Sequence, residues 1–287
     1  MIININEILS DYELIDCGNS NKLERFGDKI LIRPEPSAKS NPAKSFNEWI
    51  NIADARFVET KNQNGYWEFY GEKFSDWEVN LSVNNENLKA KLQLSTFKHV
   101  GIFPEQVINW QFLLNRKLAS NKKKQLLNLF AYTGISSLYA AIAGYNVVHI
   151  DSLKQVVERG KTMMHENNLD NIRWIVDDAR DFVRREIKRG NKYDGIILDP
   201  PIIGKGGKNK LWKLENDLIP LLQDIKKLLA PKAFVIISLY ASYINLEYLK
   251  NIADTQFAEM KIDICEEIIG KSKSGNFISH GFLLRLV

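Results

Sequence analysis

Short, nearly continuous apolar runs separated by helical patterns dominate the second half of this chain. The runs lie at 126–130, 147–150, 172–176, 193–198 and 234–238, and each is followed by apolar residues at helical spacing. Continuous runs of Leu, Ile and Val are typical of strands that are buried on both faces. Strands that alternate with helices predict right-handed βαβ units and a parallel sheet.

Two further strands are expected at 261–268 and 277–286, with Gly275-Asn276 between them. Because a short turn joins these strands, one of them must run antiparallel. The predicted fold class is therefore α/β, with a Rossmann-like sheet of seven strands that is mostly parallel and has an antiparallel last strand.

Residues 1–95 show a different, β-rich pattern. Apolar and polar residues alternate at 77–83 and 88–94, which predicts a hairpin with one solvated face. Asn64-Gly65 predicts a second hairpin between 55–60 and 66–70. We therefore predict a small β-rich domain over residues 1–95 and a larger domain over residues 96–287, with a helix starting near Glu105.

The composition limits the classes of function. The 287 residues carry a formal net charge of +4, which is compatible with an anionic partner without demonstrating one. Cys17 and Cys265 stand far apart, so they predict neither a disulfide framework nor a metal site. No apolar run approaches the roughly 18 residues of a membrane span, and the first residues lack the pattern of a signal peptide. We expect a cytoplasmic protein that binds neither membrane nor metal.

Residues that suit a ligand site follow the carboxyl ends of the predicted parallel strands, where ligands bind in open α/β sheets. The first strand is followed by Ala131, Tyr132, Thr133 and Gly134, the second by Asp151 and Ser152, the third by Asp178 and Ala179, and the fourth by Asp199, Pro200 and Pro201. Gly134 predicts a place where a cofactor lies against backbone. The Asp-Pro-Pro sequence marks the expected place of the chemistry.

The first of these loops discriminates between cofactors. It contains one glycine, whereas a dinucleotide pyrophosphate needs the G-x-G-x-x-G cradle. S-adenosylmethionine (SAM) has no phosphate, so a single glycine suffices. Asp151 can accept the ribose hydroxyls of either NAD or SAM, and Asp178 can bind the adenine amino group. Both aspartates could instead be helix N-caps.

The chain at this point resembles the class I SAM-dependent methyltransferases, and within them the large-subunit ribosomal RNA methyltransferases and their relatives. The resemblance covers about residues 60–287 and is carried by 99–106 (HVGIFPEQ), 129–134 (LFAYTG), Asp151, Asp178, 199–201 (DPP) and 204–213 (GKGGKNKLWK). It implies SAM as cofactor, RNA as substrate with ribosomal RNA as the best guess, and His99 as a residue of the substrate site. The predicted cofactor-binding residues are Phe103, Gln106, Phe130, Ala131, Tyr132, Thr133, Gly134, Asp151, Ser152, Asp178, Ala179 and Asp199.

The resemblance also bears on the atom that is methylated. Methylation of pyrimidine carbon 5 needs a covalent nucleophile, usually a cysteine, and relatives place it after the fourth or fifth strand. Here Ile202 follows Asp-Pro-Pro and the fifth strand ends Ser238-Leu239-Tyr240. We therefore predict non-covalent transfer to a base nitrogen, with Asp199 orienting the substrate. Relatives that methylate exocyclic amines carry an aromatic residue where Ile202 stands, so base stacking must come from elsewhere or the target differs.

The glycine-rich loop 204–213 carries lysines beside the expected site of methyl transfer. Lys205 and Lys208 are predicted to contact RNA phosphates, with an ordinary solvated loop as the alternative. Trp212 is expected to pack rather than stack on a base. Other functions stay open: methylation of a small molecule or a protein, an NAD-dependent oxidoreductase, which the missing glycines disfavour, and a non-catalytic RNA-binding protein, which the intact Asp-Pro-Pro disfavours. The sequence does not indicate an oligomeric state.

Overall fold

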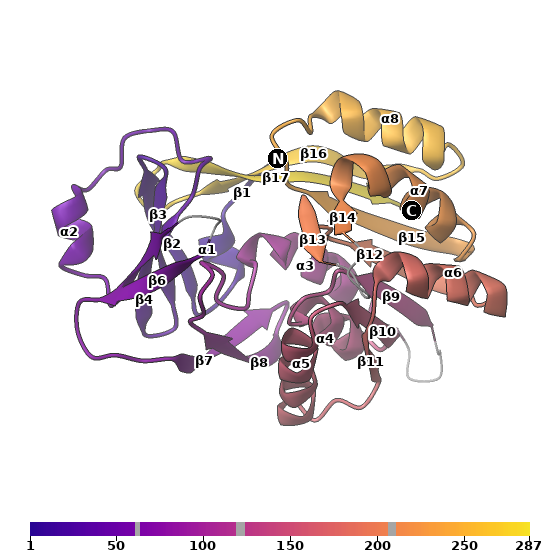
Figure 1. The fold of residues 1–287 in the computed structure, drawn as a ribbon, viewed down its shortest axis with the longest axis horizontal. Helices are drawn as coiled ribbons and strands as arrows, with labels where there is room; N and C mark the ends of the chain where they lie inside the picture. The colour runs from indigo at the N-terminus through magenta and orange to yellow at the C-terminus, as the bar shows by residue number, and fades with distance from the viewer. Residues whose placement is uncertain (61–63, 119–123, 206–210) are drawn as a thin grey trace. The chain divides into compact units, whose positions relative to one another are not determined.

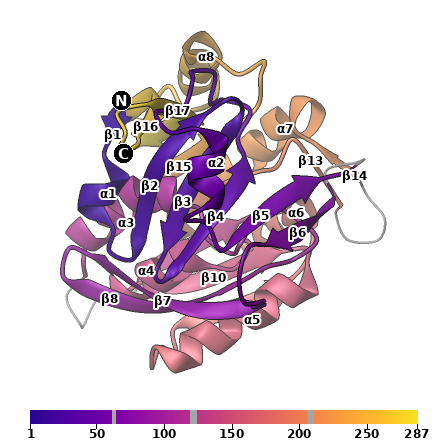
Figure 2. The same ribbon diagram turned by 90° about the vertical axis from the view of Figure 1, so that its left-hand side faces the viewer.

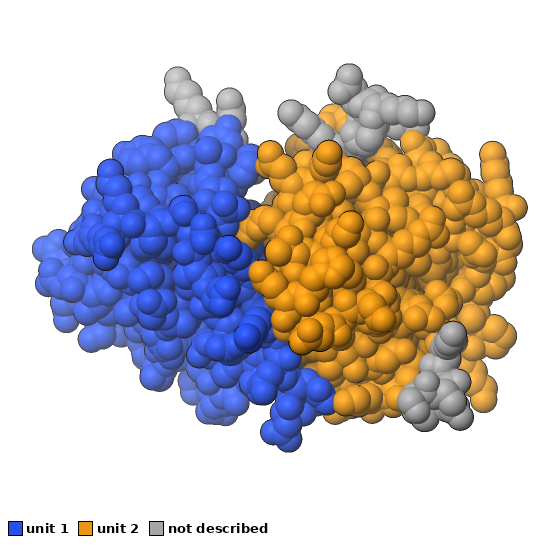
Figure 3. Space-filling model, turned by 90° about the horizontal axis from the view of Figure 1, so that it is seen from below, with its two compact units in different colours: residues 1–108, 268–280 blue, residues 109–267, 281–287 orange. Residues whose placement is uncertain are grey.

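The computed structural model describes residues 1–60, 64–118, 124–205 and 211–287 and is drawn in Figures 1 and 2. The chain divides into two compact units, coloured separately in Figure 3. Unit 1 comprises Met1–Ile108 and Ile268–His280, and unit 2 comprises Asn109–Glu267 and Gly281–Val287. The domain boundary between residues 95 and 96 stays a prediction.

A mixed sheet that lies mainly in unit 2 has the strand order β16-β17-β15-β12-β9-β10-β11. The strands are β9 (Gln125–Leu129), β10 (Asn146–Asp151), β11 (Ile172–Val176), β12 (Tyr193–Leu198), β15 (Leu229–Leu239), β16 (Ile262–Lys271) and β17 (Phe277–Leu286). The five from β9 to β15 pair in parallel, and β17 pairs antiparallel to β15. The predicted fold is confirmed. An unpredicted eighth strand, β1 (Ile2–Ile3), pairs with β16 at Ile269 and Gly270.

Helices cover both faces of this sheet (Figure 1). They are α3 (Val107–Asn115), α4 (Ile135–Ile142), α5 (Lys154–Glu166), α6 (Ala179–Arg189), α7 (Leu214–Lys226) and α8 (Leu246–Gln256), and a 3-10 turn at Pro104–Gln106 precedes α3. One large apolar cluster joins α6, α7 and α8 to the strands through side chains such as Phe182, Leu222 and Leu249. Burial of these side chains, rather than local propensity, stabilises the layers.

The order of the strands fixes where a ligand can bind. The chain proceeds from β9 to β10 and β11 on one side, and then returns to β12 and β15 on the other side of β9. The strand order therefore reverses between β9 and β12, and a crevice opens at the carboxyl ends of strands at such a point. Leu129 of β9 pairs with Leu198 of β12 and Ile150 of β10, so the loops that leave these three strands start side by side.

Unit 1 is built from two smaller sheets. The first orders β2 (Tyr12–Gly18), β3 (Asn21–Phe26), β4 (Lys29–Pro34), β5 (Ala55–Glu59) and β6 (Gly65–Phe69), and the second pairs β7 (Asp76–Val83) with β8 (Glu86–Gln93). Two short helices, α1 (Ile5–Ile8) and α2 (Phe46–Ile50), accompany them. Both predicted hairpins are confirmed, and β7 and β8 alternate buried and exposed residues as expected. β3 was not predicted.

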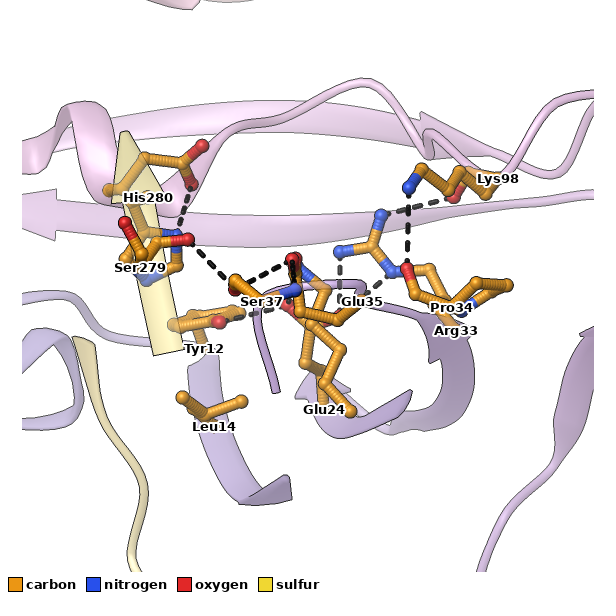
Figure 4. Close-up of polar contacts among 12 residues, drawn as sticks. Tyr12, Leu14, Glu24, Arg33, Pro34, Glu35, Ser37, Lys98, Ser279 and His280 are labelled. Atoms are coloured by element: carbon orange, nitrogen blue, oxygen red, sulfur yellow. Dashed lines mark hydrogen bonds and ion pairs between the residues drawn. The ribbon is translucent and has the colours of Figure 1, made fainter. Parts of the chain in front are cut away.

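A buried ion network lies inside unit 1 (Figure 4). Glu24 is fully buried and accepts hydrogen bonds from Arg33 Nε (2.8 Å) and the Tyr12 hydroxyl (2.9 Å), while Lys22 Nζ lies 3.4 Å from its carboxylate. Burial opposes ionisation of Glu24, but the charges of Arg33 and Lys22 outweigh it and lower the pKa of this carboxyl group. Glu24 is therefore a buried carboxylate that depends on its partners.

Two separate contacts of unit 1 hold the ends of the segment 98–105. Arg33 Nη1 donates to the Lys98 carbonyl (3.0 Å), and Glu105 Oε2 lies 3.8 Å from His280 Nδ1. Figure 4 shows Arg33 at Lys98 and, apart from it, the contact of the His280 ring. The ion network thus fixes the Lys98 end of the segment that contains His99 and Phe103.

Replacing Glu24 with Gln should lower the free energy of unfolding by about 3–5 kcal/mol, because Arg33 would keep a buried charge without its counter-ion. Since the pKa of Glu24 is lower in the folded state than in the unfolded state, its stabilising effect is present above the unfolded pKa. It is lost as the pH falls through the folded pKa. The difference between variant and wild type should therefore shrink in acid. Urea titrations at several pH values measure it, with the exposed Glu78→Gln as control; equal stability of E24Q and wild type at neutral pH would contradict the account.

Candidate active site

The loop after β9 adopts an unusual backbone conformation. Phe130, Tyr132 and Gly134 have positive φ angles of 55°, 51° and 86°, a region that residues other than glycine rarely occupy. The Ala131 amide donates to the Ile150 carbonyl (3.0 Å), and the Tyr132 amide donates to Asp151 Oδ2 (2.9 Å). Strained backbone that is held in this way is typical of functional sites.

Gly134 is required by the chain's own packing. A Cβ atom here would lie 2.7 Å from the Trp174 ring and 3.1 Å from the His149 ring, and the positive φ angle adds strain for any other residue. Packing and backbone conformation thus explain the glycine at this position without reference to a cofactor. The close approach of a cofactor to Gly134 stays a prediction.

Asp151 stands at the end of β10, next to this loop. Its two carboxylate oxygens accept the amides of Tyr132 and Leu153, each at 2.9 Å. Burial raises the pKa of Asp151, although these amides and that of Ser152 lower it. A carboxylate has about four lone-pair sites, so beside these three amides the side chain can still accept a ribose hydroxyl.

Asp178 caps α6, as the alternative interpretation of the sequence expected. It accepts the amides of Arg180 (2.9 Å) and Asp181 (3.3 Å), and its carboxylate also forms an ion pair with Arg180 Nη2 (2.8 Å). Burial opposes its ionisation, but the bonds from Arg180 outweigh it and lower the pKa of Asp178. The binding of an adenine amino group by Asp178 stays a prediction, as do roles for the adjoining Ala179 and for Ser152.

Asp199, Pro200 and Pro201 leave β12 at the point where the strand order reverses. Leu198 pairs with Leu129 on one side and with Ile237 on the other, so Asp199 starts its loop between those of Phe130 and Ser238. Asp199 is half-buried, Pro200 is buried, and Pro201 is exposed. The proposed catalytic residues therefore lie beside the loop of the predicted cofactor site.

A short hairpin of β13 (Ile203–Lys205) and β14 (Leu211–Lys213) follows. The helical spacing of apolar residues after the fourth predicted strand predicts a helix from Leu211, but Leu211–Lys213 pairs with β13 and α7 begins at Leu214. Lys205 ends β13, and Lys208 lies outside the described residues. Contact of either lysine with phosphate stays a prediction.

Trp212 joins this hairpin to the rest of the site. Its side chain is buried, its Nε1 donates to the Pro201 carbonyl (2.7 Å), and its ring centroid lies 4.7 Å from that of Phe130. The expectation that Trp212 packs is met, but the sequence did not reveal that it connects the loops after β9 and β12. The bond to Pro201 fixes the path of the Asp-Pro-Pro segment.

Arg180 was not predicted to belong to the site. Besides Asp178, it contacts Asp217 of α7 (3.0 Å) and the Leu211 carbonyl (3.3 Å), and its guanidinium lies 5.7 Å from the Trp212 ring. It therefore connects the end of β11 to the hairpin. The only signal in the sequence is an arginine two residues after an N-cap aspartate.

A buried chain of hydrogen-bonded side chains lies next to the loop after β9. Asn128 Nδ2 donates to Ser137 Oγ (2.9 Å), which lies 3.0 Å from His149 Nδ1. The donor of the bond between Ser137 Oγ and His149 Nδ1 depends on the tautomer of the histidine ring. Burial lowers the pKa of His149 to about 3, so the ring stays neutral.

The remaining predicted residues belong to unit 1. The His99 and Phe103 rings lie 5.1 Å apart, His99 is exposed, and Phe103 and Gln106 are partly buried. Their roles toward substrate and cofactor stay predictions. Over the described part of the chain, no three His, Cys, Asp or Glu side chains gather as a metal site requires. In the same residues, no helix is both long and apolar enough to cross a membrane.

Comparisons with known proteins agree with this geometry. A family model described as S-adenosylmethionine-dependent methyltransferase matches residues 59–262. The chain is 26% identical over 232 residues to the Ribosomal RNA large subunit methyltransferase K/L of Pseudoalteromonas atlantica, a match that covers 75% of this chain and 32% of that protein. The chain thus spans about a third of this curated relative's length.

Solved structures share the fold over nearly the whole chain. A SAM-dependent methyltransferase from Agrobacterium tumefaciens is 30% identical with a TM-score of 0.90, and the match covers 100% of this chain and 92% of that one. A second structure, which holds S-adenosylhomocysteine (SAH), has a TM-score of 0.72 at 18% identity and covers 93% of this chain and 72% of its own.

Replacing Asp151 with Ala should weaken SAH binding by about tenfold or more, because a charged acceptor of a ribose hydroxyl is lost. The free energy of unfolding should fall as well, because the amides of Tyr132 and Leu153 lose their acceptor. The folded pKa of Asp151 is raised, so its contribution to stability is present below the unfolded pKa and lost as the pH rises through the folded pKa. The difference in free energy of unfolding between the wild type and the variant should therefore narrow as the pH rises. Calorimetry with SAH and thermal unfolding measure both effects, with the exposed Asp170→Ala as control; unchanged SAH affinity would reject the role.

Replacing Trp212 with Phe keeps an aromatic ring beside Phe130 but removes the donor to Pro201. We expect kcat for methyl transfer to fall about five- to tenfold, since the Asp-Pro-Pro segment loses a fixing hydrogen bond, while SAH affinity stays within about twofold. Steady-state kinetics and calorimetry separate the two effects. Trp67→Phe is the matched control, because Trp67 Nε1 also donates to a backbone carbonyl, that of Ser95. A kcat equal to that of the wild type would show that the Trp212 bond does not position the segment.

Proposed function

Because the chain belongs to the family of S-adenosylmethionine-dependent methyltransferases, we propose that it transfers the methyl group of SAM to a base nitrogen of RNA, with ribosomal RNA as the foremost candidate. The observation that carries the proposal is the position of Asp199-Pro200-Pro201, which leave β12 beside the loop of Phe130. The name of the curated relative supports RNA as the substrate. Such a substrate would also place the enzyme in the cytoplasm.

The residues at the strand ends fit SAM. Asp151 would use its remaining acceptor capacity for a ribose hydroxyl. Leu153 and Val176 are exposed apolar side chains, 52% and 45% accessible, at the ends of β10 and β11, where they can flank a purine. When bound, SAM supplies a methyl group on a positively charged sulfur, which is open to attack by a neutral nitrogen.

The chain's own contribution is positioning. Asp199 would accept a hydrogen bond from the acceptor group and hold its nitrogen at the crevice, while Trp212 keeps the Asp-Pro-Pro segment in place. Displacement at a methyl group needs alignment and exclusion of water more than proton transfer. This requirement agrees with a site whose loops are held by hydrogen bonds to backbone groups and by packed aromatic rings.

The cysteines favour transfer to nitrogen over carbon 5. Cys17 is fully buried in unit 1, and burial raises the pKa of its thiol to about 11. Burial also raises the pKa of Cys265 on β16. Since the thiolate is the nucleophile, both residues are disfavoured for covalent attack on a pyrimidine.

The purified protein should transfer labelled methyl groups from SAM to RNA, and the double variant Cys17→Ala, Cys265→Ala should retain most of this activity. Asp199→Asn should lower kcat by about a hundredfold, because the acceptor is no longer oriented. Mass analysis of the nucleosides identifies the product, and RNA from cells with and without the gene shows the natural target. A methyl group on carbon 5, or loss of activity in a folded double cysteine variant, would overturn the nitrogen assignment. Methylation of protein or small molecules, with RNA left unmodified, would overturn the substrate.

A further inference from the structure

Exposed apolar side chains of unit 2 gather at one edge of its sheet. Nine large apolar side chains are exposed among the described residues of this unit, and eight of them lie between the carboxyl end of a parallel strand and the first residue of the helix that follows it. These eight are Leu153, Val176, Ile202, Ile203, Leu211, Tyr240, Tyr243 and Leu246. Single exposed apolar residues are ordinary, but a concentration at one edge marks a binding surface.

The strand order divides these side chains into two groups. Leu153 and Val176 follow β10 and β11, on the side of β9 that carries Asp151. The other six follow β12 and β15, on the opposite side of β9, and we call them the β12–β15 patch: Ile202, Ile203, Leu211, Tyr240, Tyr243 and Leu246. The first group lies where the cofactor is proposed. The β12–β15 patch lies on the side of Asp199, where the methyl acceptor must enter.

Contacts place the members of the patch near one another. The Leu214 amide donates to the Ile202 carbonyl (2.9 Å), so Ile202 adjoins the first turn of α7. Tyr243 lies in the loop after β15, and this loop starts beside the loop after β12, because Ile237 of β15 pairs with Leu198 of β12. Tyr243 is 45% exposed. The loop after β15 therefore presents an aromatic ring next to the loop that follows Asp-Pro-Pro.

The hairpin adds positive charge to this apolar surface. Lys213 pairs directly with Ile203 across the two strands. Leu211 and Lys213 are exposed on one face of β14, whereas Trp212 points to the buried face. Ile203, Leu211 and an ammonium group thus share one exposed face. Such a surface suits a planar base whose own phosphate lies beside it.

We propose that the β12–β15 patch is the base-binding platform of the enzyme, with Tyr243 stacking on an unpaired base of single-stranded RNA, Tyr240 extending the aromatic surface, and Ile203 packing against the same base. This inference rests on the proposed function. It supplies the stacking surface that Ile202 cannot provide at the position directly after Asp-Pro-Pro. Tyr240 is 47% exposed, and the edge of its ring lies over Gly281 of β17, so its plane is supported. Recognition through ring faces requires a base that is free of the RNA stack.

The test measures binding of two probes by fluorescence anisotropy in the presence of SAH. One probe is a short single-stranded oligoribonucleotide of mixed sequence, and the other is an abasic chain of the same length and charge. Wild type should bind the oligoribonucleotide more tightly. Tyr243→Ala should lose about fivefold or more of this affinity and bind the abasic chain unchanged, whereas Tyr243→Phe should bind both probes like the wild type, because stacking needs the ring and not the hydroxyl.

A matched isoleucine pair provides the control. Ile203→Ala should weaken binding of the oligoribonucleotide, whereas Ile262→Ala should not. Ile262 is 41% exposed but starts β16 at the opposite edge of the sheet, where Lys261 and Val287 exchange backbone hydrogen bonds. Thermal unfolding and SAH affinity of each variant show that fold and cofactor site are intact.

The outcomes separate this inference from the function on which it rests. In one outcome, the wild type binds the oligoribonucleotide more tightly than the abasic chain, and the folded variants Tyr243→Ala and Ile203→Ala keep this difference. That result overturns the platform and leaves RNA as the substrate. A wild type that binds both probes equally, or neither, overturns the RNA substrate and the platform together. Loss of base preference in Tyr243→Ala with retention in Tyr243→Phe supports both.

Discussion

One residue, Asp151, fastens the loops at the ends of three neighbouring strands. Its carboxylate accepts the amide of Tyr132 from the loop after β9 and the amide of Leu153 after its own strand, and its carbonyl accepts the amide of Asp177 after β11. The left-handed backbone of Phe130 and Tyr132 costs energy, and these bonds hold it. Burial of the carboxylate opposes its ionisation, as the raised pKa shows, so the chain retains an unfavourable buried group exactly where a ribose would be bound.

The same loop connects the two halves of the site. On one side, the backbone of Tyr132 is bound to Asp151; on the other, the ring of Phe130 contacts Trp212, which holds the Pro201 carbonyl. The loop after β9 is therefore fixed to both the cofactor side and the acceptor side of the strand-order reversal. Arg180 provides a second connection, from Asp178 to the β13–β14 hairpin. A methyl transfer that depends on alignment would benefit from loops that cannot move independently.

The parts of the fold that could be predicted are those whose signal is local. Buried parallel strands are continuous apolar runs, so β9 to β12 were visible as such, and their carboxyl ends gave the candidate residues. Strands β1, β3 and β14 were missed because they are short or rich in polar residues, and their pairing is stabilised by distant partners. The role of Trp212 depends on a hydrogen bond across eleven residues and on a ring from another strand. The packing of Trp174 of β11 on Gly134 joins a strand to the loop after β9, and no local pattern relates the two.

Polar and apolar side chains are distributed unevenly along the edge formed by the carboxyl ends of the parallel strands. On the side of β10 and β11, Asp151 and Asp178 would provide carboxylates to a ligand rich in hydroxyl and amino groups. On the side of β12 and β15, the exposed apolar and aromatic side chains of the β12–β15 patch are joined by Lys213. A nucleophile that is a neutral nitrogen needs no charged partner, and an apolar surface excludes the water that would compete for the acceptor's hydrogen bonds. Asp199 would then hold the acceptor, so its hydrogen bond would fix which edge of the base faces the methyl group.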